Sequence, residues 1–308
     1  MSSEAKRGMI SVLLCTLNRS EVIASCLDSL IAQTYRNFEI IVVDQSRDDR
    51  TENRCREYSD ERIRYYRVGF TGLSRARNYG LRFAQGEWIC LGDDDAVYDS
   101  LFFEKAAEHL RNCGREDKRI LCGNLRFLDK RDREVLGYGP YRDGQILNAD
   151  AMLQIGASAT LILPAGLLKE IGGFDTRFGV GARYGSGEES DAVLRMMKLG
   201  ADACYLPEMK VYHGHSDDDA SLDFNKVYKY YIGLGALLKK HLVCGGNAGL
   251  FPKFARATAG AWIKWLTGDA KQRKIYRCRI AGFHRGFARY REMPSESRVV
   301  RTKRDDTT

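Results

Sequence analysis

Short apolar runs alternate with helix-like segments along the first part of the chain, and this alternation limits the fold more than any other feature. The runs cover residues 9–15 (MISVLLC), 38–44 (FEIIVVD), 62–68 (RIRYYRV) and 87–92 (EWICLG). Between the first two, Ile23, Leu27 and Leu30 recur at helical spacing, with Ser20 as the predicted N-cap. Residues 74–84 predict a second helix. Strands that alternate with helices predict an α/β fold with a mostly parallel sheet.

The second half of the chain is less regular. Residues 158–164 predict another strand, a glycine-rich loop over 172–200 leads into a helix, and 203–215 read as extended. Beyond about residue 220 the pattern is helical to near 290. We therefore expect an α/β domain over 1–220, a helical C-terminal region over 221–292 and a disordered tail over 293–308.

The composition and the N-terminal sequence bear on the cellular location that we expect for the protein. The chain has 308 residues and no apolar run near the ~20 residues that span a bilayer. Its N-terminus, MSSEAKRG, lacks the apolar core of a signal peptide. The nine cysteines are odd in number, scattered and without a C-x-x-C pair, which favours reduced, buried thiols. We expect a cytoplasmic protein, either free or peripheral on the cytosolic face of a membrane.

Polar residues follow the predicted strands at their carboxyl ends. Thr16 ends the first, Asp44 the second, and Asp93, Asp94 and Asp95 the fourth. In a parallel sheet these ends meet at one edge, where ligands bind. Neighbouring carboxylates suit a hard cation such as Mg²⁺ or Mn²⁺, whose remaining ligands are phosphate oxygens and water. The alternative is a solvated acidic turn.

A second acidic group, Glu188, Glu189 and Asp191, lies in GSGEESD. A carboxylate there is a candidate general base for a substrate hydroxyl. The alternative is that these are first-turn acids, placed by the helix dipole.

Three further groups are weaker candidates. His213 and His215 are spaced to share one face of a strand, where they could ligate a metal. The alternative is that one of them packs in the core and the other is exposed. Arg75 and Arg77 are candidates to clamp a diphosphate. The run 217–219 (DDD) reads as a solvated loop without chemistry.

Taken in order, several motifs resemble family 2 glycosyltransferases of the GT-A fold, whose sheet is Rossmann-like. The motifs are SVLLCTLNR, FEIIVVDQS, GLSRARNYGL, GEWICLGDDD, GGFD, GSGEESDAVLR and YLPEMKVYH, across roughly residues 9–215. The resemblance implies an inverting hexosyl- or deoxyhexosyltransferase that moves a sugar from a nucleotide-diphosphate donor to a hydroxyl.

The resemblance also implies roles for individual residues. Glu189 would be the catalytic base and Glu188 its acceptor-side partner, although Glu189 stands where the family usually has aspartate. The implied metal ligands are Asp95, Asp93 and His213, for Mn²⁺ or Mg²⁺. The implied nucleotide-binding residues are Thr16, Asn18, Asp44, Arg75, Arg77, Asn78, Asp93 and Asp94. Asp44 suits the N3–H of uracil or thymine, which favours UDP or dTDP.

The C-terminal region mixes aromatic and basic residues, with Phe251, Trp262 and Trp265 beside lysines and arginines. This composition suits an anionic membrane surface, as a lipid-linked acceptor in surface polysaccharide synthesis would require. Packing of these helices on the catalytic domain, or contact within a homo-oligomer, are alternatives.

Two other function classes compete with sugar transfer. The pI near 9.0 fits a nucleic-acid-binding protein, although the chain has no zinc-finger or RNP-type motif, so we expect no nucleic-acid partner. Another metal-dependent nucleotide-sugar enzyme, a nucleotidyltransferase or a phosphatase would also use strand-end aspartates. CTLNRS lacks a glycine-rich phosphate loop, and the first strand ends in Cys15-Thr16 rather than in a nucleophilic aspartate.

Overall fold

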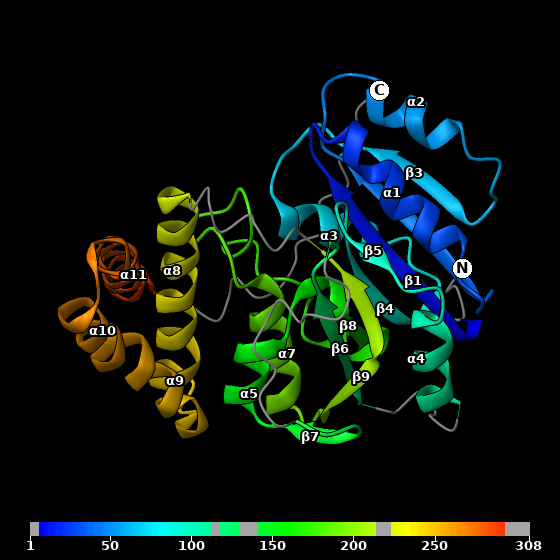
Figure 1. Ribbon diagram of the computed structural model, residues 1–308. Helices are drawn as coiled ribbons and strands as arrows, with labels where there is room; N and C mark the ends of the chain where they lie inside the picture. Colours follow the sequence, from blue (N-terminus) through cyan, green and yellow to red (C-terminus); the bar gives the residue numbers. More distant parts are fainter. Residues whose placement is uncertain (1–5, 112–117, 130–140, 214–222, 293–308) are drawn as a thin grey trace.

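The structure is a computed structural model that describes residues 6–111, 118–129, 141–213 and 223–292. Its centre is a nine-stranded sheet with the strand order β3-β2-β1-β4-β8-β6-β9-β5, and β7 pairs with β9. Helices cover both faces of the sheet, and a group of C-terminal helices stands at one side (Figure 1). The predicted α/β class is confirmed.

The first four strands form a parallel block. They are β1 (Lys6–Thr16), β2 (Phe38–Asp44), β3 (Ile63–Arg67) and β4 (Gly86–Asp93). Thr16 is in register with Asp44, and Cys15 with Asp93. The carboxyl ends of β1, β2 and β4 are therefore level with one another, as the sequence predicted.

Alternate residues of β1 face two different cores. Val12 and Leu14 pack with α1 (Ser20–Ile31) and α4 (Phe102–Leu110) on one face. Leu13 faces the other side, with α3 (Leu73–Leu81), α6 (Ala165–Glu170) and α7 (Glu188–Lys198). Because both faces are buried, the strands are apolar at every position rather than at every second one.

The second half of the sheet is mixed. It contains β5 (Val97–Tyr98), β6 (Ile120–Arg126), β7 (Gln145–Leu147), β8 (Leu161–Pro164) and β9 (Ala203–Tyr212). β8 runs antiparallel to β4 and β6, whereas β9 is parallel to β6. β9 therefore runs in the same direction as β4 and ends at Tyr212 on the same edge of the sheet, with His213 directly after it. The short β5, which follows the aspartates, pairs antiparallel with this end of β9. The α/β part also contains the helices α2 (Arg50–Arg56) and α5 (Ala149–Ile155) and the 3₁₀ turn η1 (Ser158–Thr160).

The C-terminal helices form a layer of their own with a third core. The elements are α8 (Phe224–Leu238), η3 (Lys239–Cys244, a π-helix), η4 (Ala248–Leu250), α9 (Phe251–Ala255), η5 (Arg256–Gly260, also π-helical), α10 (Ala261–Thr267) and α11 (Ala270–Arg289). Leu237 and Phe283 pack there against Phe178 and Leu194 of the α/β part. A Cβ on Gly286 would lie 1.9 Å from the carbonyl oxygen of Ile232, so glycine allows α8 and α11 to touch backbone to backbone.

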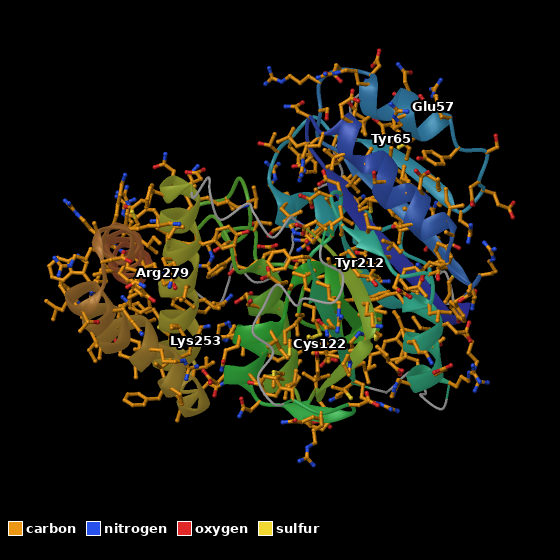
Figure 2. The ribbon with its side chains drawn as sticks, in the orientation of Figure 1. Glu57, Tyr65, Cys122, Tyr212, Lys253 and Arg279 are labelled. Carbon is orange, nitrogen blue, oxygen red and sulfur yellow. The ribbon has the colours of Figure 1, made fainter. Side chains whose placement is uncertain are left out.

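Several sequence predictions need comment. Ser20 is the first residue of α1 and not its N-cap; Arg19 holds that position without a capping side-chain hydrogen bond. The described cysteines are free thiols. Cys122 lies in the interior of the α/β part (Figure 2), and burial raises its pKa to about 12. His215, the run 217–219 and the tail 293–308 lie outside the described residues. The domain boundaries remain a prediction. Within the described ranges, the structure contains no helix that is both long and apolar enough to cross a bilayer.

Candidate active site

The site forms where β1, β2 and β4 end. Thr16 Oγ1 donates a 2.6 Å hydrogen bond to Asp94 Oδ2, which ties the end of β1 to the aspartate run. Thr16 and Asp94 are both buried. The register of the parallel strands thus brings together residues 78 positions apart in sequence, as predicted.

Asp44 is fully buried at the end of β2. Its Oδ2 accepts a hydrogen bond from the Tyr65 hydroxyl, and its Oδ1 accepts one from the backbone N–H of Ser46, both at 2.8 Å. The Ser46 hydroxyl in turn accepts from the N–H of Asn18, which has a left-handed φ of 54°. These bonds fix the Asp44 carboxylate and the loop after β1 in one arrangement.

Arg19 is a site residue that the sequence reasoning missed. Its guanidinium pairs with Asp94 at 2.6 Å and with Asp95 at 2.5 Å. Asp95 also contacts His213 Nε2 at 2.9 Å. His213 directly follows β9, whose end pairs with the short β5 after the aspartates. Arg19 follows Asn18 in CTLNRS, but only the turn between β1 and α1 aims its side chain at the aspartates.

Arg77 connects the two acidic groups. It is fully buried in α3, and its guanidinium lies 2.8 Å from Glu188 Oε1 and 3.3 Å from Asp93 Oδ1. Its Nε is buried and has no hydrogen-bond partner among the described residues. The Arg77 guanidinium therefore joins the aspartate run and the GSGEESD segment, which are distant in sequence, into one site.

The electrostatics of the site separate its carboxyl groups. Burial raises the pKa of Asp93 to about 6, against the opposing charge of Arg77. Burial also acts on Asp95, but hydrogen bonds and charges from His213 and Arg19 hold its pKa well below the usual range. Burial and the Glu188 carboxylate raise the pKa of Glu189 well above its ordinary value. The pKa values of neighbouring carboxyl groups are thus shifted in opposite directions, upward for Asp93 and Glu189 and downward for Asp95.

The glycine-rich loop before α7 presents Glu188 and Glu189. Gly187 is the left-handed N-cap of α7, with φ 85°, so Glu188 is the first helical residue. A Cβ on Gly179 would lie 2.8 Å from Ser74 Oγ and 3.1 Å from Glu188 Oε2. The loop can therefore close over α3 only with glycine at that position.

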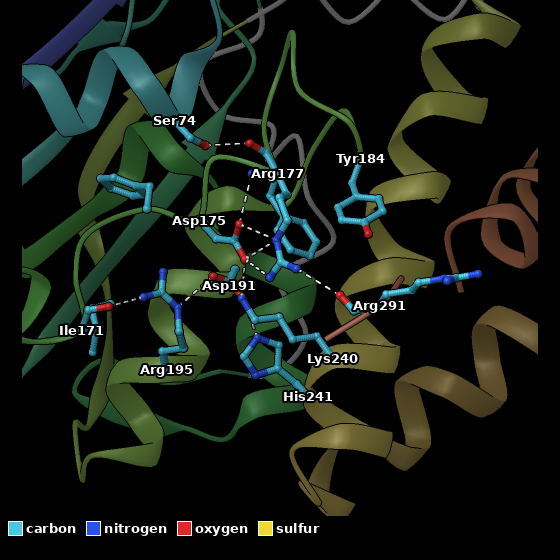
Figure 3. Close-up of polar contacts among 12 residues, drawn as sticks. Ser74, Ile171, Asp175, Arg177, Tyr184, Asp191, Arg195, Lys240, His241 and Arg291 are labelled. Atoms are coloured by element: carbon cyan, nitrogen blue, oxygen red, sulfur yellow. Dashed lines mark hydrogen bonds and ion pairs between the residues drawn. The ribbon is translucent and has the colours of Figure 1, made fainter. Parts of the chain in front are cut away.

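Asp191, the third acid of the segment, is fully buried and belongs to a separate ion network (Figure 3). Its carboxylate contacts Arg195 at 2.8 Å, Lys240 at 2.5 Å and His241 at 2.8 Å. Lys240 also reaches Asp175 at 2.8 Å. Because Lys240 and His241 lie in η3, the C-terminal layer is fastened to the helix that carries Glu188 and Glu189.

The structure does not bring Arg75 or Asn78 to the carboxylates. The Asn78 side-chain amide donates to the Phe174 carbonyl and accepts from the Phe174 N–H, both at 2.8 Å. The Arg75 guanidinium is exposed and stacks on Phe70 at 4.4 Å. Both side chains leave α3 on a different face from Arg77, so their implied nucleotide contact finds no support in this geometry.

A separate group of possible metal ligands lies elsewhere. His109, Asp143 and Glu208 place their ligand atoms within 4.8 Å of one another. They belong to α4, the turn before β7, and β9, not to the strand ends that form the site. Asp143 is exposed, and exposed acidic groups of this kind are common without a metal.

Comparisons with known proteins agree with this geometry. Residues 11–135 match the model of the family described as glycosyl transferase family 2. A glycosyltransferase of Rickettsia typhi is 27% identical over 180 residues, 57% of this chain and 56% of that protein. WfgD of Escherichia coli, a UDP-Glc:α-D-GlcNAc-diphosphoundecaprenol β-1,3-glucosyltransferase, is 31% identical over 91 residues, 29% of this chain and 36% of its own. The chain thus spans about half or less of these relatives.

The fold comparison extends over almost the whole chain. The mannosyltransferase PcManGT of Pyrobaculum calidifontis, solved with GDP-Man and Mn²⁺, superposes with a TM-score of 0.67 at 15% identity, over 93% of this chain and 89% of that one. At that identity the likeness concerns the fold alone. The match over residues 11–135, together with the strand-end aspartates and the GT-A arrangement of sheet and helices, supports a family 2 glycosyltransferase of the GT-A fold.

Proposed function

We propose that the protein is an inverting glycosyltransferase that moves a sugar from a nucleotide-diphosphate donor to an acceptor hydroxyl. The observation that carries the proposal is the position of Arg77, whose guanidinium contacts Asp93 on one side and Glu188 on the other. Arg77 thereby holds Asp93, a proposed ligand of the metal ion that accompanies the donor, near Glu188, which is proposed to contact the acceptor hydroxyl. The match of residues 11–135 to the glycosyl transferase family 2 model supports the same proposal.

On the donor side, the nucleotide would lie along the ends of β1 and β2. Thr16, Asn18 and Asp44 are held there by the hydrogen bonds described above. A carboxylate oxygen accepts more than one hydrogen bond, so Asp44 retains capacity for the N3–H of uracil or thymine. We therefore favour UDP or dTDP as the leaving group.

The donor set fits a divalent cation. Asp93, Asp95 and His213 would hold Mn²⁺ or Mg²⁺, with carboxylate oxygens as the hard ligands and one imidazole. When bound, the cation would neutralise negative charge on the departing diphosphate. The pairing of Arg19 with both Asp94 and Asp95 supports this proposal, because a single guanidinium balances only one of the two negative charges.

On the acceptor side, Glu189 is the proposed base. It would take the proton of the acceptor hydroxyl while that oxygen bonds to the anomeric carbon, and the bond from that carbon to the diphosphate oxygen breaks on the opposite face. Its raised pKa makes it a stronger proton acceptor than an ordinary carboxylate. Glu188, held by Arg77, would orient the acceptor.

The acceptor class is proposed from the relatives and from α8. The name of the E. coli relative specifies a diphosphoundecaprenol-linked acceptor, and we propose a glycan or lipid-linked saccharide here. Tyr230 of α8 is half exposed, and burial together with the charges of Glu189 and Asp93 raises its pKa to about 12. Tyr230 thus lies within electrostatic range of the carboxylates, where an acceptor sugar would stack on it.

Titration of UDP, dTDP and GDP with and without Mn²⁺ tests the donor site. We expect Mn²⁺ to strengthen binding of UDP or dTDP to the wild type, and Asp95→Asn to weaken that binding at least tenfold by removing a ligand charge. Asp202→Asn, an exposed substitution at the opposite end of β9, is the matched control. Nucleotide binding that ignores both Mn²⁺ and Asp95→Asn would contradict the proposal, and RNA binding in its place would favour the nucleic-acid alternative.

We also propose that the segment 251–268 contacts an anionic membrane surface. Phe251, Ile263 and Leu266 are about 60% exposed and Trp262 is 45% exposed, an uncovered apolar face on α9 and α10. The segment contains three cationic side chains and no acidic one. Arg256 pairs with Asp150 and Lys253 donates to the Leu153 carbonyl, so Lys264 is the exposed cation of the segment without an ion pair among the described residues. Such a face would place the site near a lipid-linked acceptor.

Vesicle binding tests the membrane contact. Trp262→Ser with Leu266→Ser should lower partitioning onto phosphatidylglycerol vesicles by tenfold or more, because each large apolar side chain contributes about 1.5–3 kcal/mol when buried. Ile146→Ser, an equally exposed apolar residue on β7, should have no effect. Equal loss with both variants, or equal binding to neutral vesicles, would contradict the contact.

A further inference from the structure

A second groove lies on the outer face of α3, away from the carboxylates. Its volume is about 640 Å³, and α3, α6 and the glycine-containing loop after α6 form its walls. The groove is lined by aromatic, cationic and polar side chains, among them Phe70, Arg75, Tyr79, Arg82, Lys169 and Thr176. The volume falls in the range of small-molecule sites, roughly 300–1,000 Å³.

The groove is cationic, and its cations are free to bind. Arg75, Arg82 and Lys169 are exposed and make no ion pair with any residue in the described ranges. No acidic residue lines the groove. Most other arginines of the α/β part are paired, for example Arg64 with Glu39 and Arg67 with Asp49. Three unpaired cations around one hollow therefore form a site for negative charge.

Aromatic rings lie among these cations. Arg75 stacks on Phe70 at 4.4 Å, and the Arg82 guanidinium lies 5.6 Å from the Tyr79 ring. Stacking pre-orients a guanidinium, which leaves its N–H groups directed outward for bidentate contact with a carboxylate or phosphate. The ring faces offer apolar surface to the C–H face of a sugar ring.

Helical geometry separates the groove from the transfer site. Arg75, Tyr79 and Arg82 recur at i, i+4 and i+7 along α3 and its C-cap and so form one stripe. Arg77 leaves the same helix on another face and is fully buried against Glu188 and Asp93. Asn78, fixed to Phe174, stands between the two faces.

We propose that this groove binds an anionic oligosaccharide, a chain of sugar rings that carries carboxylate or phosphate groups. Resting on the proposed transferase function, the groove would hold a part of the acceptor chain remote from the reacting hydroxyl. Rings would stack on Phe70 and Tyr79, and the acidic groups would pair with the three cations. A neutral glycan would lack the negative charge that pairs with the cations, and a bare polyphosphate would lack the sugar rings that stack on the aromatic side chains.

Calorimetric titration of the full chain with oligogalacturonate of six residues tests the groove, with maltohexaose and tripolyphosphate as comparison probes. We expect the oligogalacturonate to bind at least tenfold more tightly than either. Arg75→Ala with Arg82→Ala should lower that affinity about tenfold or more, because charge-assisted hydrogen bonds are lost. Both side chains are exposed, so the variant retains its fold. Lys271→Ala with Arg277→Ala on α11 removes the same charge elsewhere and should change nothing.

The outcomes separate the groove from the transfer site. The proposal would be overturned if the α11 control lost as much affinity for oligogalacturonate as the groove variant, or if tripolyphosphate bound as tightly as the oligosaccharide. Either result would mean that binding depends on overall positive charge and not on the groove. Displacement of the oligosaccharide by UDP would show that the groove belongs to the donor pocket and would also overturn it. These titrations contain no donor, so failure of the donor test above leaves their result unaffected.

Discussion

Glu189→Gln is expected to lower the rate of nucleoside diphosphate release from the cognate donor in the presence of acceptor by about 10²- to 10⁴-fold, the usual contribution of a general base. Nucleotide affinity should stay within about twofold, since Glu189 lies in α7 and, among the described residues, has no hydrogen bond or ion pair with Thr16, Asn18 or Asp44. The amide keeps the size of the side chain and removes only its proton-accepting ability. Rates and nucleotide titrations on the same preparations check both statements.

The pH profile gives a second measurement of the same role. Burial and Glu188 raise the pKa of Glu189 well above that of an ordinary glutamate, so the base is lost on acidification at a higher pH than usual. The wild-type rate should rise with pH through that raised pKa, and the glutamine variant should lose this limb. Glu57→Gln, an exposed residue of another segment, is the control. A variant with full activity and an unchanged profile would remove Glu189 from the mechanism.

Asp191→Asn is expected to lower the free energy of unfolding by about 3–5 kcal/mol, the usual cost of breaking a buried ion pair. Asp191 is fully buried, and its neutralisation would leave Arg195, Lys240 and His241 without their shared counter-charge. Urea unfolding measures the change. Asp150→Asn is the matched control, because its partner Arg256 is half exposed and such a pair is worth about 1 kcal/mol or less.

The same network has a pH signature. Burial opposes ionisation of Asp191, but Arg195, His241 and Lys240 hold its pKa well below the ordinary value of 3.8. Arg177 and Lys240 likewise lower the pKa of Asp175 to about 2. A depressed folded-state pKa stabilises the fold above the unfolded value, so stability should fall as the pH drops below about 4. If Asp191→Asn and Asp150→Asn lose equal stability, the network does not fasten the C-terminal layer.

The sequence predicted the α/β class and the position of the acidic run because these depend on local patterns. Doubly buried strands are apolar at every position, and strand ends carry polar residues such as Thr16 and Asp44. The helix start at Ser20 was less predictable, since Arg19 occupies the N-cap to reach Asp94 and Asp95. Tertiary ion pairing there outweighed local capping preference.

By itself, the sequence determined that Thr16, Asp44 and Asp93–Asp95 meet at one edge, because parallel strands bring their carboxyl ends together whatever else packs around them. Only the tertiary structure decided that Arg77 joins Asp93 to Glu188, and that Asp191 pairs with the C-terminal helices rather than with the candidate active site. Arg77 and Glu188 are 111 residues apart. Contacts of that kind depend on how the layers dock, and local periodicity contains no information about the docking of one layer on another.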